Sequence, residues 1–203
     1  MASMSTLIDD FATQDTAKWT FGSGASVTGE QLVMQCLSSY SSEVLSVDFY
    51  DLTGSYALME VVSPQSPGTG TTSTYFFCRE DPDINAVRWI IAGATLLAEH
   101  RVAGTNTTIF SAAFDATTHR WLRFREDAGT IYWDTSPDGV VWTNRATWVS
   151  TITLTALKAA LGSGYYGAES SPAPAVVDNF NLIPPPVVAD QPMIVRRVAP
   201  ARR

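Results

Sequence analysis

The sequence predicts an all-β fold made of two antiparallel sheets packed as a sandwich. Apolar and polar residues alternate with a period of two along most of the chain, and β-branched and aromatic residues are frequent in these segments. Clusters of Gly, Pro, Asp, Asn and Ser separate the segments, while helical periodicity is almost absent. Many short strands in one unit require two packed sheets or a closed barrel.

The predicted strands follow one another at short intervals along the chain. A segment at 155–161 (TALKAAL) is ambiguous, since it also fits a single helical turn. The thirteen predicted strands are Ser26–Thr28, Gln31–Leu37, Glu43–Phe49, Tyr56–Val62, Thr72–Arg79, Ala86–Ala92, Thr95–Val102, Thr107–Ala113, His119–Glu126, Thr130–Asp134, Val140–Ala146, Ala159–Gly167 and Ala175–Leu182.

Turn residues divide these strands and mark the end of the body. Asp81-Pro82-Asp83 and Ser136-Pro137-Asp138-Gly139 are predicted turns, because Pro presets φ and Gly accepts a positive φ. Three prolines begin at Pro184 and break the last strand. We therefore expect one sandwich domain over residues 1–183 and a Pro-rich linker with a basic tail over residues 184–203.

Composition and charge narrow the function classes. The chain has 203 residues, of which 45% are hydrophobic, so one domain with a sizeable core is expected. Residues 1–183 carry nine bases against 19 acids, which argues against nucleic-acid binding by the body. No apolar run approaches the roughly 18 residues of a membrane span. The first residues, MASMSTLIDDF, contain no basic region followed by an apolar run, so we expect no secretory leader.

The segment at 119–148 predicts a hairpin with a defined register. A two-residue turn at Ala128-Gly129 would place Leu122, Phe124, Ile131 and Trp133 inside the sandwich. The cross-strand pairs would be Phe124 with Trp133, Arg123 with Asp134 and Arg125 with Tyr132.

The outward row of this hairpin is a candidate glycan platform. Aromatic rings stack on the apolar face of a sugar, and charged groups bond to its hydroxyls. The alternative is a solvated sheet face with ordinary cross-strand pairs. The candidate residues are Trp121, Arg123, Arg125, Tyr132 and Asp134.

Three motifs carry a family resemblance. Together they resemble the concanavalin A-like lectin/glucanase superfamily of jelly rolls. The motifs are IDDF at 8–11, WLRFRE followed by TIYWDTSPDGVVW in the middle, and VVDNFNL at 176–182. The resemblance implies two sheets, one of them concave, with the first and last strands adjacent. The resemblance also suggests a calcium site, for which the candidate ligands are Asp9, Asp10, Asp178 and Asn179. The alternative is that these side chains cap strand ends by bonding to the local backbone. We favour this alternative and therefore expect no metal.

Glucanases of this superfamily share a Glu-x-Asp-x-Glu strand, which this chain lacks. Glu43 and Asp48 would point to opposite faces of a regular strand, and the acids between Glu80 and Asp83 lie in a turn where solvation is expected. No phosphate loop, nucleophile elbow or dinucleotide fingerprint is present. We therefore expect no enzymatic activity and no cofactor.

The organisation of the chain also resembles minor tail proteins of bacteriophages that infect actinobacteria. This implies a virion protein, made in the host cytoplasm, that displays a jelly roll and contacts host glycans; a bacterial carbohydrate-binding module and a capsid decoration protein are the alternatives. Homo-oligomers are common among such proteins. The tail is expected to dock onto other virion proteins through Met193, Ile194, Val195, Arg196, Arg197, Arg202 and Arg203.

Overall fold

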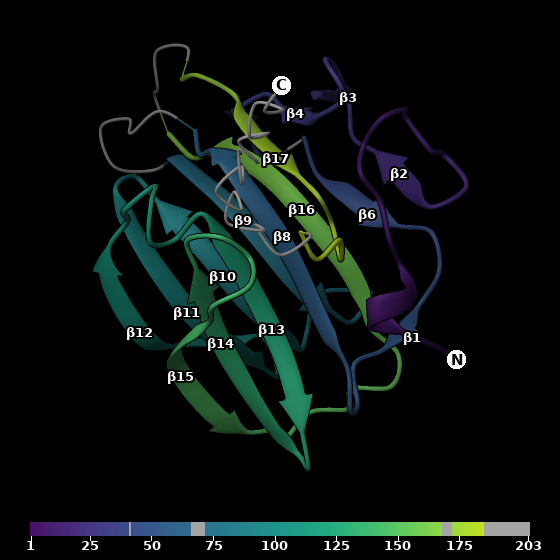
Figure 1. Cartoon of the computed structure of the whole chain (residues 1–203), viewed down its shortest axis with the longest axis vertical. Coiled ribbons are helices and arrows are strands. Elements are labelled where there is room, and N and C mark those ends of the chain that lie inside the picture. The colour runs from purple at the N-terminus through teal and green to yellow at the C-terminus, as the bar shows by residue number, and fades with distance from the viewer. Residues whose placement is uncertain (41, 66–71, 168–171, 185–203) are drawn as a thin grey trace, which may run out of the picture.

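A computed structural model describes residues 1–40, 42–65, 72–167 and 172–184. The chain folds into two facing sheets that form a jelly-roll sandwich (Figure 1). The helical content of the described residues is one 3-10 turn, η1 (Met4–Thr6). No described helix has the length and apolar character needed to cross a membrane. The predicted fold class is confirmed.

The first sheet contains eight strands, and all but one of its pairings are antiparallel. The short strand β5 (Leu37–Ser38) pairs in parallel with β16 and lies off the main path. The path itself runs through β12 (Thr105–Ala113), β11 (Thr95–Val102), β10 (Ala86–Ala92), β9 (Thr72–Arg79), β16 (Lys158–Tyr165), β6 (Val44–Ser46) and β2 (Trp19–Phe21).

The second sheet contains seven antiparallel strands. A separate two-stranded parallel sheet joins β1 (Ala2–Ser3) to β7 (Tyr50–Asp51). In Figure 1 the edge strands of the two large sheets, β12 and β15, lie on the same side of the molecule. The seven-stranded path runs through β15 (Thr143–Val149), β14 (Thr130–Ser136), β13 (Trp121–Asp127), β8 (Tyr56–Ser63), β17 (Ala175–Asp178), β4 (Leu32–Met34) and β3 (Ala25–Val27).

The inward side chains of the two sheets form the core. Phe124 and Trp133 are both fully buried and are cross-strand partners, as the hairpin register predicted. Two indoles also connect the sheets by hydrogen bonds. Trp133 Nε1 donates to the backbone oxygen of Arg88 at 3.0 Å, and Trp89 Nε1 donates to that of Arg123 at 3.2 Å. The predicted hairpin register is confirmed.

The N-terminal segment lies against the last described strand region. Asp9 forms a backbone bridge with Phe180, so the IDDF and VDNF motifs are neighbours, as the resemblance implied. The amide of Asn181 fixes this junction, because it donates to the backbone oxygens of Met4 and Leu7 and accepts the N–H of Leu58. The two ends of the body are thereby held together.

Several predicted boundaries are wrong for local reasons. The ambiguous segment at 155–161 forms no helical turn, and β16 begins within it at Lys158, one residue before the predicted start at Ala159. The third strand of the predicted hairpin region begins at Thr143 rather than Val140. The Asp138 carboxylate accepts the N–H groups of Val140 and Val141 and prolongs the turn.

Candidate functional site

The outer face of the eight-stranded sheet carries a row of aromatic side chains on β9. Phe76 points into the core, where it is fully buried, so the alternation of the strand directs Tyr75 and Phe77 outward. Their rings stack with centroids 4.5 Å apart. Two tyrosines from the neighbouring loops extend the row: Tyr40 lies 5.8 Å from Tyr75 and 4.8 Å from Tyr166. We call Tyr40, Tyr75, Phe77 and Tyr166 the aromatic platform.

Two glycines of β16 make room for this platform. A Cβ atom on Gly162 would lie 2.1 Å from the ring of Tyr75, and one on Gly164 would lie 2.6 Å from the backbone of Tyr40. Glycine inside a strand weakens it but permits close approach of another group. The sequence LGSGY at 161–165 therefore carries a signal for the site that our sequence analysis missed.

The four rings differ in what they offer to a ligand. Tyr75 is only 5% exposed, and its hydroxyl donates to Glu43 Oε2 at 3.1 Å. Burial and the adjacent Glu43 carboxylate raise the pKa of Tyr75 well above its usual range. Tyr40 and Phe77 are half-buried and Tyr166 is 65% exposed. Tyr75 thus anchors the platform, while the other three rings present surface.

Charged side chains border the platform on the side of β10 and β11. Asp83 Oδ2 accepts a hydrogen bond from Arg88 Nη2 and lies 3.6 Å from Arg101 Nη1. Arg88 also donates to Asn106 Oδ1 at 3.2 Å and lies 4.5 Å from the centroid of the Phe77 ring. Burial of Arg88 lowers the pKa of its guanidinium, and the Asp83 carboxylate opposes that effect. Arg88 and Arg101 are thus both paired with Asp83, and Arg88 also contacts the Phe77 ring.

The same region holds a concentration of polar atoms without partners. Six buried side-chain nitrogen and oxygen atoms lack a hydrogen-bond partner in the part of the chain that the structure describes, and four of them lie here. Such atoms cost stability, and native proteins hold few of them. They are Nε of Arg79, Nε of Arg88, Nε of Arg101 and Oδ1 of Asp83.

The platform and the charged groups enclose a shallow hollow of ≈ 340 Å³, the lower end of the range for small-ligand sites. Rings for stacking and polar groups for hydrogen bonds therefore converge on one space. The lining residues are Tyr40, Ser73, Tyr75, Phe77, Asp83, Arg88, Ile90, Arg101, Asn106 and Tyr166.

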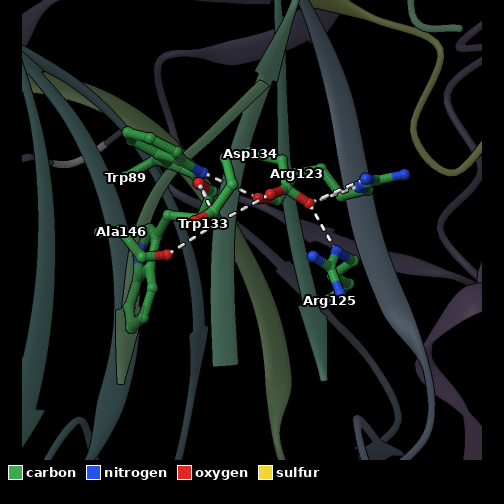
Figure 2. A network of polar contacts seen from close by, with 7 residues as sticks. Trp89, Arg123, Arg125, Trp133, Asp134 and Ala146 are labelled. Atoms are coloured by element: carbon green, nitrogen blue, oxygen red, sulfur yellow. Dashed lines mark hydrogen bonds and ion pairs between the residues drawn. The ribbon is translucent and has the colours of Figure 1, made fainter. Parts of the chain in front are cut away.

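The platform predicted from the sequence lies on the outer face of the other sheet. The structure brings its five residues together, and we call them the Asp134 face: Trp121, Arg123, Arg125, Tyr132 and Asp134. Figure 2 shows the Asp134 carboxylate directed toward both arginines; its Oδ2 accepts from Arg123 Nη2 at 2.8 Å and from Arg125 Nε at 2.9 Å. Asn144 Nδ2 donates to the other oxygen at 3.0 Å. The carboxylate is thus saturated.

The rings of the Asp134 face are occupied as well. Arg125 lies 3.7 Å from the centroid of the Tyr132 ring, and Arg123 lies 4.0 Å from that of Trp142. Trp121, which the sequence placed toward solvent, is 4% exposed and lines a small cavity with Pro184. These contacts occupy one side of the Tyr132 and Trp142 rings, and a hollow of ≈ 240 Å³ lies beside Arg123 and Trp142.

The calcium candidates also find local partners. Asp9 accepts from the N–H of Phe11 at 2.8 Å and from Trp19 Nε1 at 2.9 Å. Burial, together with the nearby Glu60 and Asp10, raises the pKa of Asp178. Asp10 Oδ1 accepts the N–H of Ala12, and Asn179 Nδ2 donates to Glu60. Among the described residues, no group of three or more His, Cys, Asp or Glu side chains is arranged to hold a metal ion.

The carboxylates weighed as catalytic candidates separate into two groups. Glu43 and Asp83 border the aromatic platform, where arginines hold both of them. Glu80 accepts from Asn85, and Asp48 is exposed. The expectation that the acids between Glu80 and Asp83 are merely solvated is therefore wrong for Glu80 and Asp83. The predicted docking residues 193–197, 202 and 203 lie outside the described residues.

Comparison with known proteins identifies the fold. No protein-family model and no curated protein matches the chain. Solved structures do match. They include a β-glucanase of Bacillus licheniformis (TM-score 0.60, 16% identity, 86% of this chain and 94% of that one). They also include the catalytic domain of a laminarinase from Thermotoga petrophila (TM-score 0.65, 8% identity, 85% and 94%) and a β-agarase A in complex with oligoagarose (TM-score 0.58, 12% identity, 85% and 90%).

These similarities establish the concanavalin A-like jelly roll and correct one expectation. The absence of a Glu-x-Asp-x-Glu strand suggested a chain without enzymatic activity. The matching structures include glucanases and an agarase that are covered over most of their length, so this architecture is one that enzymes use. At 8–16% identity the likeness shows the fold alone. The phage resemblance finds no counterpart among these structures.

Proposed function

We propose that the protein binds carbohydrate on the aromatic platform of the eight-stranded sheet. The observation that carries the proposal is the convergence of three solvent-accessible rings with hydrogen-bonding groups in one hollow. The solved structures of the same fold add support, because one of them was determined with oligoagarose bound.

The chemistry of the hollow suits a sugar chain. The C–H face of a pyranose packs against aromatic rings, here Tyr40, Phe77 and Tyr166. Sugar hydroxyls both donate and accept, which fits a surface where Ser73 and Asn106 stand beside paired charges. Tyr75 contributes by holding the neighbouring rings in place, since its own hydroxyl is bonded to Glu43.

Affinity electrophoresis in gels containing laminarin, lichenan or agarose tests this proposal. Tyr166→Ala and Phe77→Ala should each weaken retardation by about tenfold, because each removes a stacking surface. Tyr132→Ala on the Asp134 face is the matched control and should leave retardation unchanged. If only Tyr132→Ala loses binding, the glycan binds to the Asp134 face, as the sequence predicted. Absence of binding across a broad glycan array would refute the proposal.

Hydrolysis of the bound glycan is a second candidate, favoured by the enzymes that share the fold. The carboxylates next to the platform are Glu43 and Asp83. The measurement is reducing-end release from the same three polysaccharides. Activity that disappears in both Glu43→Gln and Asp83→Asn would support hydrolysis, and release at the level of a protein-free blank would reject it for these substrates.

A bacteriophage tail is the proposed setting for this binding face. The basis is the sequence resemblance to minor tail proteins, together with the apolar and basic residues 193–203. Particles purified from an actinobacterial host should contain the chain, and removal of residues 187–203 should abolish its incorporation. If antibodies against the chain label only the capsid of these particles, the chain is a decoration protein. If the particles do not contain the chain, a bacterial carbohydrate-binding module is favoured.

A further inference from the structure

The turn that precedes β10 places a carboxylate inside the hollow. Asp83 follows Pro82, and its side chain keeps 27% exposure. One of its oxygens, Oδ2, contacts both Arg88 and Arg101, and all three residues line the hollow. A carboxylate held between two guanidinium groups is the arrangement in which proteins bind anionic ligands.

The charged groups around the hollow balance one another. Arg79 pairs with Glu43 at 2.6 Å, beside the pair of arginines that share Asp83. Glu99 stands directly opposite Arg88 in the strand register and accepts a hydrogen bond from Thr108. Three arginines therefore face three carboxylates, and these six groups together carry no net charge.

We infer that Asp83 determines specificity by acting as a built-in counter-ion, which makes the platform select neutral glycans over acidic ones. The inference rests on the proposed carbohydrate function. An acidic sugar would bring a carboxylate to a hollow whose arginines are already neutralised, and burying a charge without a partner is costly. A neutral sugar meets no such cost. Without the Asp83 charge, the two guanidinium groups would offer an acidic sugar a bidentate partner.

The same turn supplies a matched control. Asp81 lies two residues away and is more exposed, at 42%; it lies 3.6 Å from Lys158, which does not line the hollow. Asp81→Asn removes the same charge from the same loop without changing the neutralisation of Arg88 and Arg101. A general effect of protein net charge would appear in both variants, whereas a local effect would appear in Asp83→Asn alone.

The experiment compares each neutral polysaccharide with its own derivative oxidised at C6 to a carboxylate. Titrations measure binding of laminarin and oxidised laminarin, and of the corresponding agarose pair, to the wild-type chain and the two variants. We expect the wild type to bind the neutral form about tenfold more tightly. Asp83→Asn should remove or reverse that preference, with added salt weakening the new binding. Asp81→Asn should retain the wild-type ratio.

A second variant guards against instability of Asp83→Asn, in which the buried Arg88 loses its ion-pair partner. Arg101→Gln leaves the hollow with excess negative charge, so it should increase the preference for the neutral glycan. The inference would be overturned if Asp83→Asn and Arg101→Gln both kept the wild-type ratio of neutral to oxidised glycan affinity. A wild type that prefers the oxidised form would overturn it as well. A wild type that binds neither form of any glycan would instead refute the proposed carbohydrate function.

Discussion

The two outer faces of the sandwich are built from the same residue types but are completed in different ways. Each carries tyrosines or tryptophans beside arginines and an aspartate. On the Asp134 face, one buried carboxylate satisfies both arginines, and each guanidinium covers a ring. On the platform face, Arg88 likewise covers the Phe77 ring, but four buried polar atoms of the described residues lack partners and Tyr166 is largely exposed.

The difference indicates which face is structural and which is available to a ligand. A network with every member satisfied rigidifies the fold, whereas unsatisfied groups cost stability and concentrate where proteins function. We therefore expect changes on the Asp134 face to alter stability without altering glycan binding. Changes on the platform face should alter glycan binding without lowering stability.

The largest effect is expected for Asp134→Ala. Asp134 is 1% exposed and serves Arg123, Arg125 and Asn144, so its removal leaves two partly buried guanidinium groups without an anion. Breaking a buried pair in this way costs about 3 kcal/mol. Urea unfolding should show that loss, while glycan affinity measured below the transition stays at the wild-type value. A stable variant with lost binding would reverse our assignment of the two faces.

Gly162→Ala should affect the platform face. The new methyl group would overlap Tyr75, which must move and take its neighbours with it. Overpacking of this kind costs about 1–3 kcal/mol, and binding should fall with it.

Gly54→Ala separates the loss of stability from the loss of binding. Gly54 has φ +60°, and no described atom beyond its chain neighbours lies within 4 Å of the place that a methyl group would take. Alanine therefore strains the backbone without touching the platform, and the strain costs about 1 kcal/mol. This variant should be destabilised and should still bind glycan. If Gly162→Ala binds glycan as well as Gly54→Ala does, the position of the Tyr75 ring over Gly162 is not needed for binding.

The sequence predicted the fold well where alternation was long. The boundaries of β9, β10 and β11 match the predicted ranges, because seven or eight residues fix the inward side of a strand. The short strands β1, β2 and β7 were missed, because two or three residues carry too few positions for a period. The Trp121–Ser136 hairpin was predicted in register since its turn and its core residues agree.

The site was harder to predict because its chemistry depends on strand order. Arg88 and Arg101 are 13 positions apart and meet only through the register of β10 with β11. Asp83 reaches both from a turn whose acids looked solvated. Tyr75 requires Gly162 on β16, far away along the chain. Alternation along one strand indicates which way a side chain points, but it does not indicate which residues of other strands and turns are its neighbours.

A smaller effect concerns His119, which leads into β13. Its Nδ1 accepts the backbone N–H of Asp115 at 3.0 Å, so the folded state requires a neutral ring. Burial and Arg145 lower its pKa from 6.5, whereas Asp115 opposes the shift. Because the folded pKa lies below the unfolded one, stability is complete above about pH 6.5 and declines as the pH falls below it.

Urea unfolding of the wild type and of His119→Gln at pH 7.5 and pH 5.5 measures this effect. The wild type should lose about 1 kcal/mol on acidification, the value of one hydrogen bond, and the variant should lose less. His100, whose pKa burial also lowers, accounts for a remaining slope. An identical pH dependence in both proteins would show that His119 does not titrate in this range.

The smallest effect is expected for Tyr132→Ala. The ring of Tyr132 supports Arg125, which keeps its bond to Asp134 when the ring is removed, so only the cation–π contact is lost. Such a contact at a partly exposed site contributes about 0.5–1 kcal/mol. Thermal unfolding should detect this loss, and glycan affinity should not change. The variant is also the most direct test of the face that the sequence favoured, because a stacking role for Tyr132 predicts weaker binding with little change in stability.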